Sequence, residues 1–272
     1  MSQRSGRLAV LGDPLAFTRS PELHRAGLAA LALDGDSEAL RTPVASLGDR
    51  LRALAAAGYR GVNLTSPLKA AGLLHVARVS EAARRARSVN TIGFEPDGTW
   101  GDTTDGPGFV DLLRSLGRDP ARERVVLLGA GGAARSLALA LIAAGCPAVT
   151  ASARRPDASR DDWQSLAPAE VVRWRSPEEA AIARRATVVV NATPLSGADG
   201  ALDLEALGRR TLVIDLGYGE RPTEWVRRAR ELGLEAYDGL GLLVFQARLS
   251  LALWYARPVP VDPLARAVGW PR

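Results

Sequence analysis

Residues Val125–Ala134 read VVLLGAGGAA. The four apolar residues predict a buried strand, and the apolar run Ala133–Ala144 predicts a helix. Between them the sequence fits G-x-G-x-x-A, in which Gly129 permits a tight turn, Gly131 lets the backbone approach a pyrophosphate, and Ala134 lets helix and strand pack closely. A plain tight turn would explain the glycines alone, but the strand before and the helix after favour a dinucleotide-binding turn. The residues expected to contact the cofactor there are Gly129, Ala130, Gly131, Gly132 and Ala133.

The second strand of this domain, Ala148–Ala151, is the first one after the turn, and it ends at the residues expected to face the ribose of the cofactor. An acid there accepts the 2′-hydroxyl of NAD, whereas a cation accommodates the 2′-phosphate of NADP. This chain has Ser152-Ala153-Arg154-Arg155 at that point, and its next carboxylate is Asp157. We therefore expect NADP (NADPH), held by Arg154 and Arg155. Arginine is common throughout the chain, so a chance pair is the alternative.

Apolar strand-like runs alternate with helical patterns along the chain, which is typical of an α/β fold. At 272 residues the chain exceeds the usual size of one core, so we expect two domains with the ligand in a cleft between them. An N-terminal α/β substrate domain is expected at 1–104 together with 239–272, and an NADP-binding Rossmann domain at 105–238. The predicted strands are Leu8–Gly12, Ser37–Val44, Gly61–Thr65, Thr91–Phe94, Thr99–Gly101, Val125–Leu128, Ala148–Ala151, Thr187–Asn191 and Leu212–Asp215. The predicted helices include Pro21–Ala32, Leu47–Ala57, Ala133–Ala144 and Gly239–Ala256.

The composition is that of a globular protein and argues against several classes of function. Hydrophobic residues make up 47% of the chain, but no apolar run is long enough to span a membrane. The net charge of +5 comes from arginines intermixed with acids, so we expect no nucleic-acid partner. The single cysteine, Cys146, allows no internal disulfide and fits a reducing, cytoplasmic setting. With only His24 and His75 as histidines, neither a histidine-rich metal site nor a Ser-His-Asp hydrolase is favoured.

Lys69 is the only lysine, because the other members of the Lys+Arg total of 35 are arginines (35 − 1 = 34). Guanidinium does not release its proton at ordinary pH, whereas an ammonium can be tuned by its surroundings to give up a proton or take one back. A lone lysine among so many arginines is therefore a candidate proton-transfer group. The alternative is a coding bias that left one lysine in place by chance.

Around Lys69 the chain resembles the shikimate dehydrogenase family, and the resemblance extends through most of its length. The motifs occur in the family's order and with sensible spacing, which makes the resemblance specific. They are Thr18-Arg19-Ser20-Pro21 with His24, Asn63-Leu64-Thr65-Ser66-Pro67-Leu68-Lys69, Val89-Asn90-Thr91, Asp102-Thr103-Thr104-Asp105-Gly106, Gly129 to Arg135, Asn191 to Pro194, and Leu242-Leu243-Val244-Phe245-Gln246.

The resemblance implies a role for each matching residue. Lys69 would protonate the alkoxide left by hydride addition to a ketone, and Asp105 would orient the ammonium. The residues that would bind the substrate are Thr18, Ser20, Thr65, Asn90, Tyr218 and Gln246, with the two hydroxyls of Thr18 and Ser20 on its carboxylate. Leu216 and Gly239 would line the nicotinamide through backbone contacts.

Several of these residues also have a structural interpretation. Thr18 and Ser20 could cap the helix that starts at Pro21, and Asp105 could cap a helix that follows Gly106. Gln246 could be a solvated helix position. His24 is interpreted as a hydrogen-bonded packing residue rather than as a base.

The activity implied by the resemblance is the reversible, NADPH-dependent reduction of 3-dehydroshikimate to shikimate in aromatic amino-acid (chorismate) biosynthesis. The substrate would be a small hydroxy acid, and the enzyme a monomer or homodimer. Two alternatives stay open, a quinate/shikimate-type dehydrogenase of shifted specificity and a catalytically silent NADP-binding sensor. Departures from the family pattern are the reason for considering a dehydrogenase of shifted specificity. Arg87, if it points inward, would change the charge near the ring pocket. The departures are Thr18, Arg87-Ser88, Thr103, Ala153, Gly219-Glu220 and Leu242.

Overall fold

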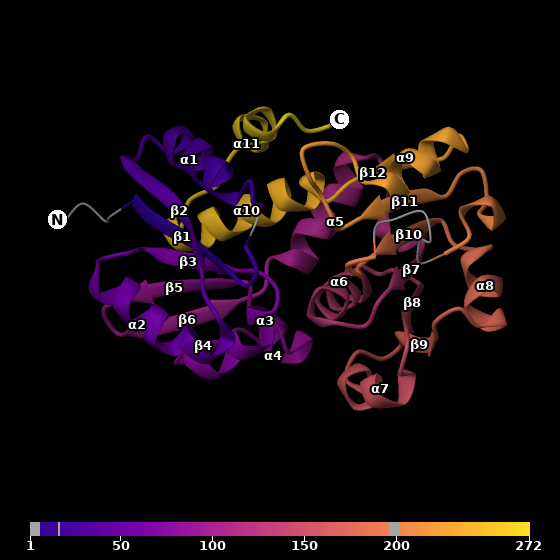
Figure 1. Cartoon of the computed structure of the whole chain (residues 1–272), viewed down its shortest axis with the longest axis horizontal. Coiled ribbons are helices and arrows are strands. Elements are labelled where there is room, and N and C mark those ends of the chain that lie inside the picture. Colours follow the sequence, from indigo (N-terminus) through magenta and orange to yellow (C-terminus); the bar gives the residue numbers. More distant parts are fainter. Residues whose placement is uncertain (1–5, 16, 196–201) are drawn as a thin grey trace. The chain divides into compact units, whose positions relative to one another are not determined.

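The structure, a computed structural model, describes residues 6–15, 17–195 and 202–272 (Figure 1). The chain divides into two compact units. Unit 1 comprises Met1–Gly108 and Leu243–Trp270, and unit 2 comprises Phe109–Leu242 and Pro271–Arg272. The chain passes from one unit to the other within α5 (Asp105–Ser115) and again within α10 (Leu240–Tyr255). These changes lie a few residues beyond the domain boundaries expected at 104/105 and 238/239.

Unit 1 is built on a mixed six-stranded sheet with the strand order β2-β1-β3-β5-β6-β4. Strand β1 lies parallel to both β2 and β3, and β5 is antiparallel to β3 and β6. Buried β3 places its polar residue, Asn63, inside the unit. The strands are β1 (Gly6–Gly12), β2 (Gly35–Arg41), β3 (Gly61–Leu64), β4 (Arg78–Val79), β5 (Thr91–Glu95) and β6 (Gly98–Asp102).

Helices of unit 1 cover this sheet with apolar faces. Leu47, Leu51 and Leu54 recur at helical spacing on α2 and pack with Val62 and Ile92 of the sheet in one core. Burial of each such side chain contributes roughly 1.5–3 kcal/mol. The helices are α1 (Ser20–Ala30), α2 (Leu47–Ala56), α3 (Leu68–Ala71), α4 (Glu81–Ala86) and α11 (Val261–Val268), with the 3₁₀ turns η1 (Val44–Ser46) and η2 (Gly72–His75).

Unit 2 is a doubly wound sheet with the strand order β12-β11-β10-β7-β8-β9, and every pairing in it is parallel. Numbered from β7 along the chain this is 6-5-4-1-2-3, the Rossmann order, with its switch point between β7 and β10. Strands β7, β10 and β11 are nearly continuous apolar runs because both faces of a parallel sheet are covered. The strands are β7 (Arg124–Leu128), β8 (Ala148–Ala153), β9 (Glu170–Arg173), β10 (Val188–Asn191), β11 (Leu212–Asp215) and β12 (Glu235–Tyr237).

One core of unit 2 lies between its sheet and α9, where Trp225, Val226 and Ala229 are buried against Val189 and Val213. The helical elements are α6 (Gly132–Ala143), α7 (Pro156–Gln164), α8 (Pro177–Ala183) and α9 (Glu224–Glu231), with the 3₁₀ turns η3 (Pro120–Arg122) and η4 (Leu204–Ala206).

The predicted α/β class with a Rossmann-type fold is confirmed, and the predicted strands all exist with small differences at their ends. The strand expected through Val44 was predicted too long. It ends at Arg41 because Pro43 has no N–H group to continue the ladder, and the η1 turn follows. The short strands β4, β9 and β12 were not predicted.

Candidate active site

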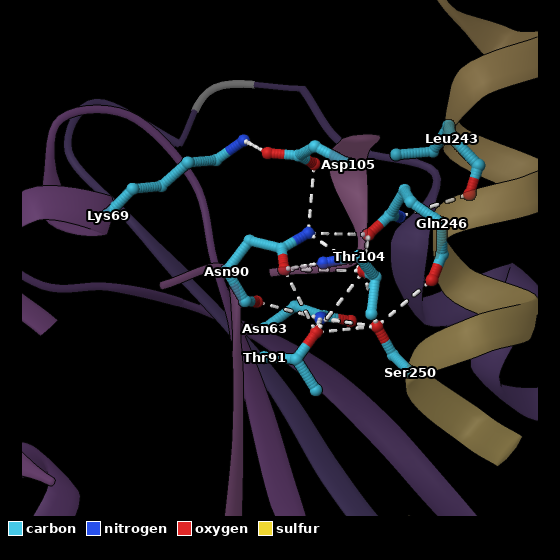
Figure 2. A network of polar contacts seen from close by, with 9 residues as sticks. All are labelled: Asn63, Lys69, Asn90, Thr91, Thr104, Asp105, Leu243, Gln246 and Ser250. Carbon is cyan, nitrogen blue, oxygen red and sulfur yellow. Dashed lines mark hydrogen bonds and ion pairs between the residues drawn. The ribbon is translucent and has the colours of Figure 1, made fainter. Parts of the chain in front are cut away.

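Lys69 and Asp105 form an ion pair in unit 1, with Lys69 Nζ 2.6 Å from Asp105 Oδ2 (Figure 2). Lys69 lies on α3, whose neighbouring Leu68 is fully buried and anchors the short helix. Asp105 is the first residue of α5, where the helix dipole favours a carboxylate. The Lys69 side chain is 23% exposed and that of Asp105 is 6% exposed, so the ammonium borders solvent while its partner is covered. This is an arrangement in which an acid/base group is both held and accessible.

Asn90 holds the other oxygen of this carboxylate, because its Nδ2 donates to Asp105 Oδ1 at 2.9 Å. The orientation of the Asn90 amide follows from its neighbours. The backbone N–H of Thr104 can only donate, and it lies 2.8 Å from Asn90 Oδ1. Nδ2 therefore faces Asp105, and also the oxygen of Gln246 at 3.2 Å.

A buried polar network continues below Asn90 (Figure 2). Asn63 Nδ2 donates to the carbonyl of Asn90 at 2.9 Å and to Ser250 Oγ at 3.0 Å. Ser250 lies 2.7 Å from Thr91 Oγ1, and Thr91 Oγ1 donates to Asn90 Oδ1 at 3.1 Å. Sequence reasoning gave no site role to Asn63, Thr91, Thr104 or Ser250. Asn63, Thr91 and Thr104 lie within the quoted motifs, and Asn63 is also a polar residue in the otherwise apolar run Gly61–Leu64, whereas Ser250 gave no signal.

His24 closes the network on its far side. It is fully buried, with Nε2 at 2.8 Å from Asn63 Oδ1 and Nδ1 at 2.8 Å from Ser37 Oγ. Burial is the main reason that the pKa of His24 falls from 6.5 to about 4, and the nearby charge of Arg25 lowers it further, against the hydrogen bond with Asn63. A neutral imidazole with both nitrogens hydrogen-bonded is a packing residue, as predicted.

The other predicted substrate residues of unit 1 lie on α10, after β3 and at the start of α1. Gln246 is only 6% exposed, so the alternative of a solvated helix position is wrong; its Nε2 donates to Leu243 O at 3.0 Å. Thr65 follows β3 and is half-buried. Half-buried Thr18 accepts the N–H of Ser20 at 3.2 Å and its Oγ1 donates to the Ser20 hydroxyl at 3.2 Å. The helix begins at Ser20 with no side-chain hydrogen bond from its N-cap residue, Arg19.

Arg87 is exposed at the end of α4, in a left-handed conformation with φ +48°. Its guanidinium is therefore not buried in a ring pocket.

In unit 2 the glycine turn combines a positive φ with open space beside its backbone. Gly129 has φ +109°, and a Cβ there would lie 3.1 Å from Ala192 O, so glycine is favoured on both counts. A Cβ on Gly131 would meet nothing within 4 Å, so space lies beside the backbone. Helix α6 begins at Gly132 with no side-chain cap, which leaves its first N–H groups for a ligand. Gly132 and Ala133, in this first turn, are half-buried, and Ala130 precedes them.

Arg154 and Arg155 are exposed directly after β8, and Arg155 is the N-cap residue of α7. Both stand at the end of the second Rossmann strand, the position where a 2′-phosphate is read. These residues, together with the glycine turn, fit NADP.

The remaining predicted residues, Leu216, Tyr218 and Gly239, lie on two adjoining segments of unit 2. The N–H of Leu216 donates to Asn191 O at 2.9 Å, and half-buried Tyr218 follows. The N–H of Gly239 donates to Gly217 O at 2.9 Å, and a Cβ on Gly239 would lie 2.2 Å from Leu216 O. Glycine is thus required where these two segments touch.

The described residues were also compared with the patterns of a metal site and of a membrane-spanning helix. They contain no group of three His, Cys, Asp or Glu side chains arranged to hold a metal ion. No helix among them is long and apolar enough to cross a membrane.

A Rossmann sheet with a G-x-G-x-x-A turn, in one chain with a unit that carries a paired lysine, is typical of a nicotinamide-dependent oxidoreductase. Residues 10–92 match the family model described as shikimate dehydrogenase substrate binding domain, and residues 124–219 match that described as NADP oxidoreductase coenzyme F420-dependent. The chain belongs to the shikimate dehydrogenase family.

Named relatives and a solved structure support this membership. The shikimate dehydrogenase (NADP(+)) of Rhodospirillum rubrum is 38% identical, over 95% of this chain and 94% of the relative. That of a strain of Thermus thermophilus is 40% identical, over 91% and 92%. A crystal structure of shikimate 5-dehydrogenase from Thermus thermophilus in complex with NADP(H) and shikimate has a TM-score of 0.85 at 35% identity, and the match covers 97% of this chain and 98% of that one.

Proposed function

We propose that this protein is an NADP-dependent shikimate dehydrogenase that reversibly reduces 3-dehydroshikimate to shikimate, a step of aromatic amino-acid biosynthesis. The observation that carries the proposal is the Lys69–Asp105 ion pair of 2.6 Å in a chain of this family. The name of the Rhodospirillum relative and the NADP(H) and shikimate of the Thermus structure supply the substrate and cofactor.

Bound NADPH supplies the hydride for the reduction. The substrate carbonyl carbon gains that hydride, its oxygen becomes an alkoxide, and the Lys69 ammonium gives the alkoxide its proton. In the oxidation direction neutral Lys69 takes the hydroxyl proton back. Asp105 aims Nζ and balances its charge, and Asn90 keeps the carboxylate from turning.

Binding of the substrate is assigned to polar groups of both units. Thr18 and Ser20 place two hydroxyls side by side, which suits a carboxylate. Thr65, Asn90 and Gln246 would meet the ring hydroxyls and the carbonyl. Tyr218 would approach the carboxylate end. Unit 1 would thus be the substrate and catalytic domain, and unit 2 the dinucleotide-binding domain.

The assigned cofactor contacts follow the same division. The turn Gly129–Ala133 would hold the pyrophosphate, and Arg154 and Arg155 the 2′-phosphate. The backbone at Leu216 and Gly239 would meet the nicotinamide. We also assign the enzyme to the cytoplasm, and the free, buried Cys146 supports this assignment. The enzyme would act on a small hydroxy acid as a monomer or homodimer.

The absorbance of the reduced cofactor, NADPH or NADH, tests this assignment with shikimate and quinate as substrates and NADP and NAD as oxidants. The wild type should oxidise shikimate with NADP faster than any other combination. Lys69→Ala should lose at least about 100-fold in kcat, within the range for a general acid–base group, and still bind NADPH. Faster turnover of quinate would favour the shifted dehydrogenase. Tight NADP binding without oxidation of either alcohol would favour the silent sensor.

A further inference from the structure

The carbonyl of Ala130, inside the glycine turn, accepts two hydrogen bonds from side chains outside the turn. Trp163 Nε1 donates to it at 3.2 Å and Arg135 Nη1 at 3.3 Å. Trp163 comes from α7 and is 2% exposed, and Arg135 comes from α6 and is 8% exposed. Arg135 is itself paired with Asp162 of α7, with Nη1 and Oδ2 3.1 Å apart. Two side chains from two helices therefore hold one peptide group.

Holding this carbonyl also sets the direction of the next N–H. In a planar trans peptide the C=O and N–H bonds point in opposite directions. With the Ala130 oxygen turned toward Trp163 and Arg135, the N–H of Gly131 points away from them. Gly131 is exposed, and its missing side chain leaves open space. The donor thus points away from Trp163 and Arg135 at an exposed residue of the turn, where a pyrophosphate would bind.

We propose that Trp163 and Arg135 are positioning residues for the dinucleotide turn, which preorganise the Gly131 amide for the pyrophosphate. The proposal rests on the proposed function, since it presumes that the turn binds NADPH. Neither side chain needs to touch the cofactor. Their contribution is to keep the Ala130–Gly131 peptide from rotating, so that binding does not have to order it.

Trp163→Phe tests the role of the N–H, because phenylalanine keeps an aromatic ring and removes the donor. Trp225→Phe is the matched control. Trp225 is equally buried, at 2% exposure, in the same unit, and its Nε1 has no hydrogen-bond partner among the described residues. The probes are NADPH and NADH, titrated into enzyme without substrate and followed by their fluorescence. The thermal midpoint of each variant and the KM for shikimate are measured alongside.

Loss of one hydrogen bond should raise the Kd for NADPH about fivefold in Trp163→Phe. The Kd for NADH should rise by the same factor, because the two cofactors share the pyrophosphate. Arg154→Gln, in contrast, should weaken NADPH alone. The KM for shikimate at saturating NADP should stay at the wild-type value. Trp225→Phe should bind both cofactors as the wild type does.

The proposal is overturned if Trp163→Phe binds NADPH with the wild-type Kd, or if Trp225→Phe weakens binding as much. Should Trp163→Phe fail to fold, Asp162→Asn replaces it, since this partly exposed residue orients Arg135. It should raise both Kd values about twofold, and unchanged values would overturn the role of Arg135. A wild type that binds neither cofactor would instead refute the proposed function, so the two failures are distinguishable.

Discussion

Asn90 Nδ2 donates a hydrogen bond of 2.9 Å to Asp105 Oδ1, whereas Lys69 contacts the other carboxylate oxygen, Oδ2. Both oxygens of the carboxylate therefore have partners, and the hydrogen bond from Asn90 fixes the orientation in which the carboxylate meets the ammonium. Asn90 is fixed in turn by Thr104 and Thr91. The position of the Lys69 ammonium thus depends on an amide that carries no charge.

Asn90→Ala should lower kcat/KM for shikimate by roughly 10- to 100-fold, because a hydrogen bond to a charged group is worth about 1.5–3 kcal/mol. Steady-state kinetics at saturating NADP measure the loss. The Kd for NADPH should not change, since the glycine turn belongs to the other unit. Thr99→Ala, in the same sheet, is the control and should retain wild-type kinetics. An Asn90→Ala enzyme with wild-type kcat/KM would show that Asp105 needs no second partner.

The depressed pKa of His24 predicts a loss of stability in acid. The group has a pKa near 6.5 in the unfolded chain and about 4 in the folded protein. The unfolded state therefore takes up the proton first. The stability that depends on a neutral His24 is complete above pH 6.5 and is lost as the pH falls from 6.5 toward 4, to a total of roughly 3 kcal/mol.

Urea unfolding at pH 7 and pH 5, followed by tryptophan fluorescence, checks this prediction. His24 lies edge-on to Trp254, with ring centroids 5.4 Å apart, so the probe is close to the titrating group. His24→Gln can still donate to Asn63 and accept from Ser37, but it does not titrate. The wild type should lose more stability than His24→Gln over this interval. Parallel losses in the two proteins would assign the acid sensitivity to other groups.

The left-handed conformation of Arg87 predicts a stabilising substitution. A residue with a Cβ is strained at φ +48°, whereas glycine adopts this conformation readily at the end of a helix. Arg87→Gly should raise the free energy of unfolding by about 0.5–1 kcal/mol, measured by urea denaturation. Arg85→Gly, inside the same helix, should lower it by about 1 kcal/mol. The same sign for both variants would contradict the role of the backbone conformation.

Much of the fold could be predicted because its signals are local. The apolar runs of β7, β10 and β11 and the turn after Leu128 each identify themselves within a short stretch of sequence. Strands β4 and β12 escaped because two or three residues show almost no periodicity. Strand β9 has the same four-residue length as β10 and β11, but charged residues at both of its ends leave no apolar run to mark it. Their pairing depends on a neighbour that the local sequence does not contain.

The residues of the candidate site likewise divide into those with a local sequence signal and those without one. Lys69 was found through its rarity and Asp105 through its motif, and the structure brings the two together. Asn63 and Ser250 are hydrogen-bonded although they lie 187 positions apart in the chain, and nothing in the sequence around either residue indicates this partner. Trp163 belongs to no motif, and its hydrogen bond to Ala130 joins residues 33 positions apart in the chain. Residues that act through other residues leave little trace in local sequence.

Gly239→Ala should be destabilising, because the new Cβ would lie 2.2 Å from Leu216 O, a backbone atom that cannot move alone. The segment that carries Leu216 and Tyr218 would have to shift. Overpacking of this kind costs about 1–3 kcal/mol, seen as a lower urea midpoint, and a displaced Tyr218 should raise the KM for shikimate. Gly208→Ala is the control, since its Cβ would make an ordinary contact of 3.4 Å with Thr211 Oγ1. If both variants have the wild-type KM, Tyr218 does not bind the substrate from this segment.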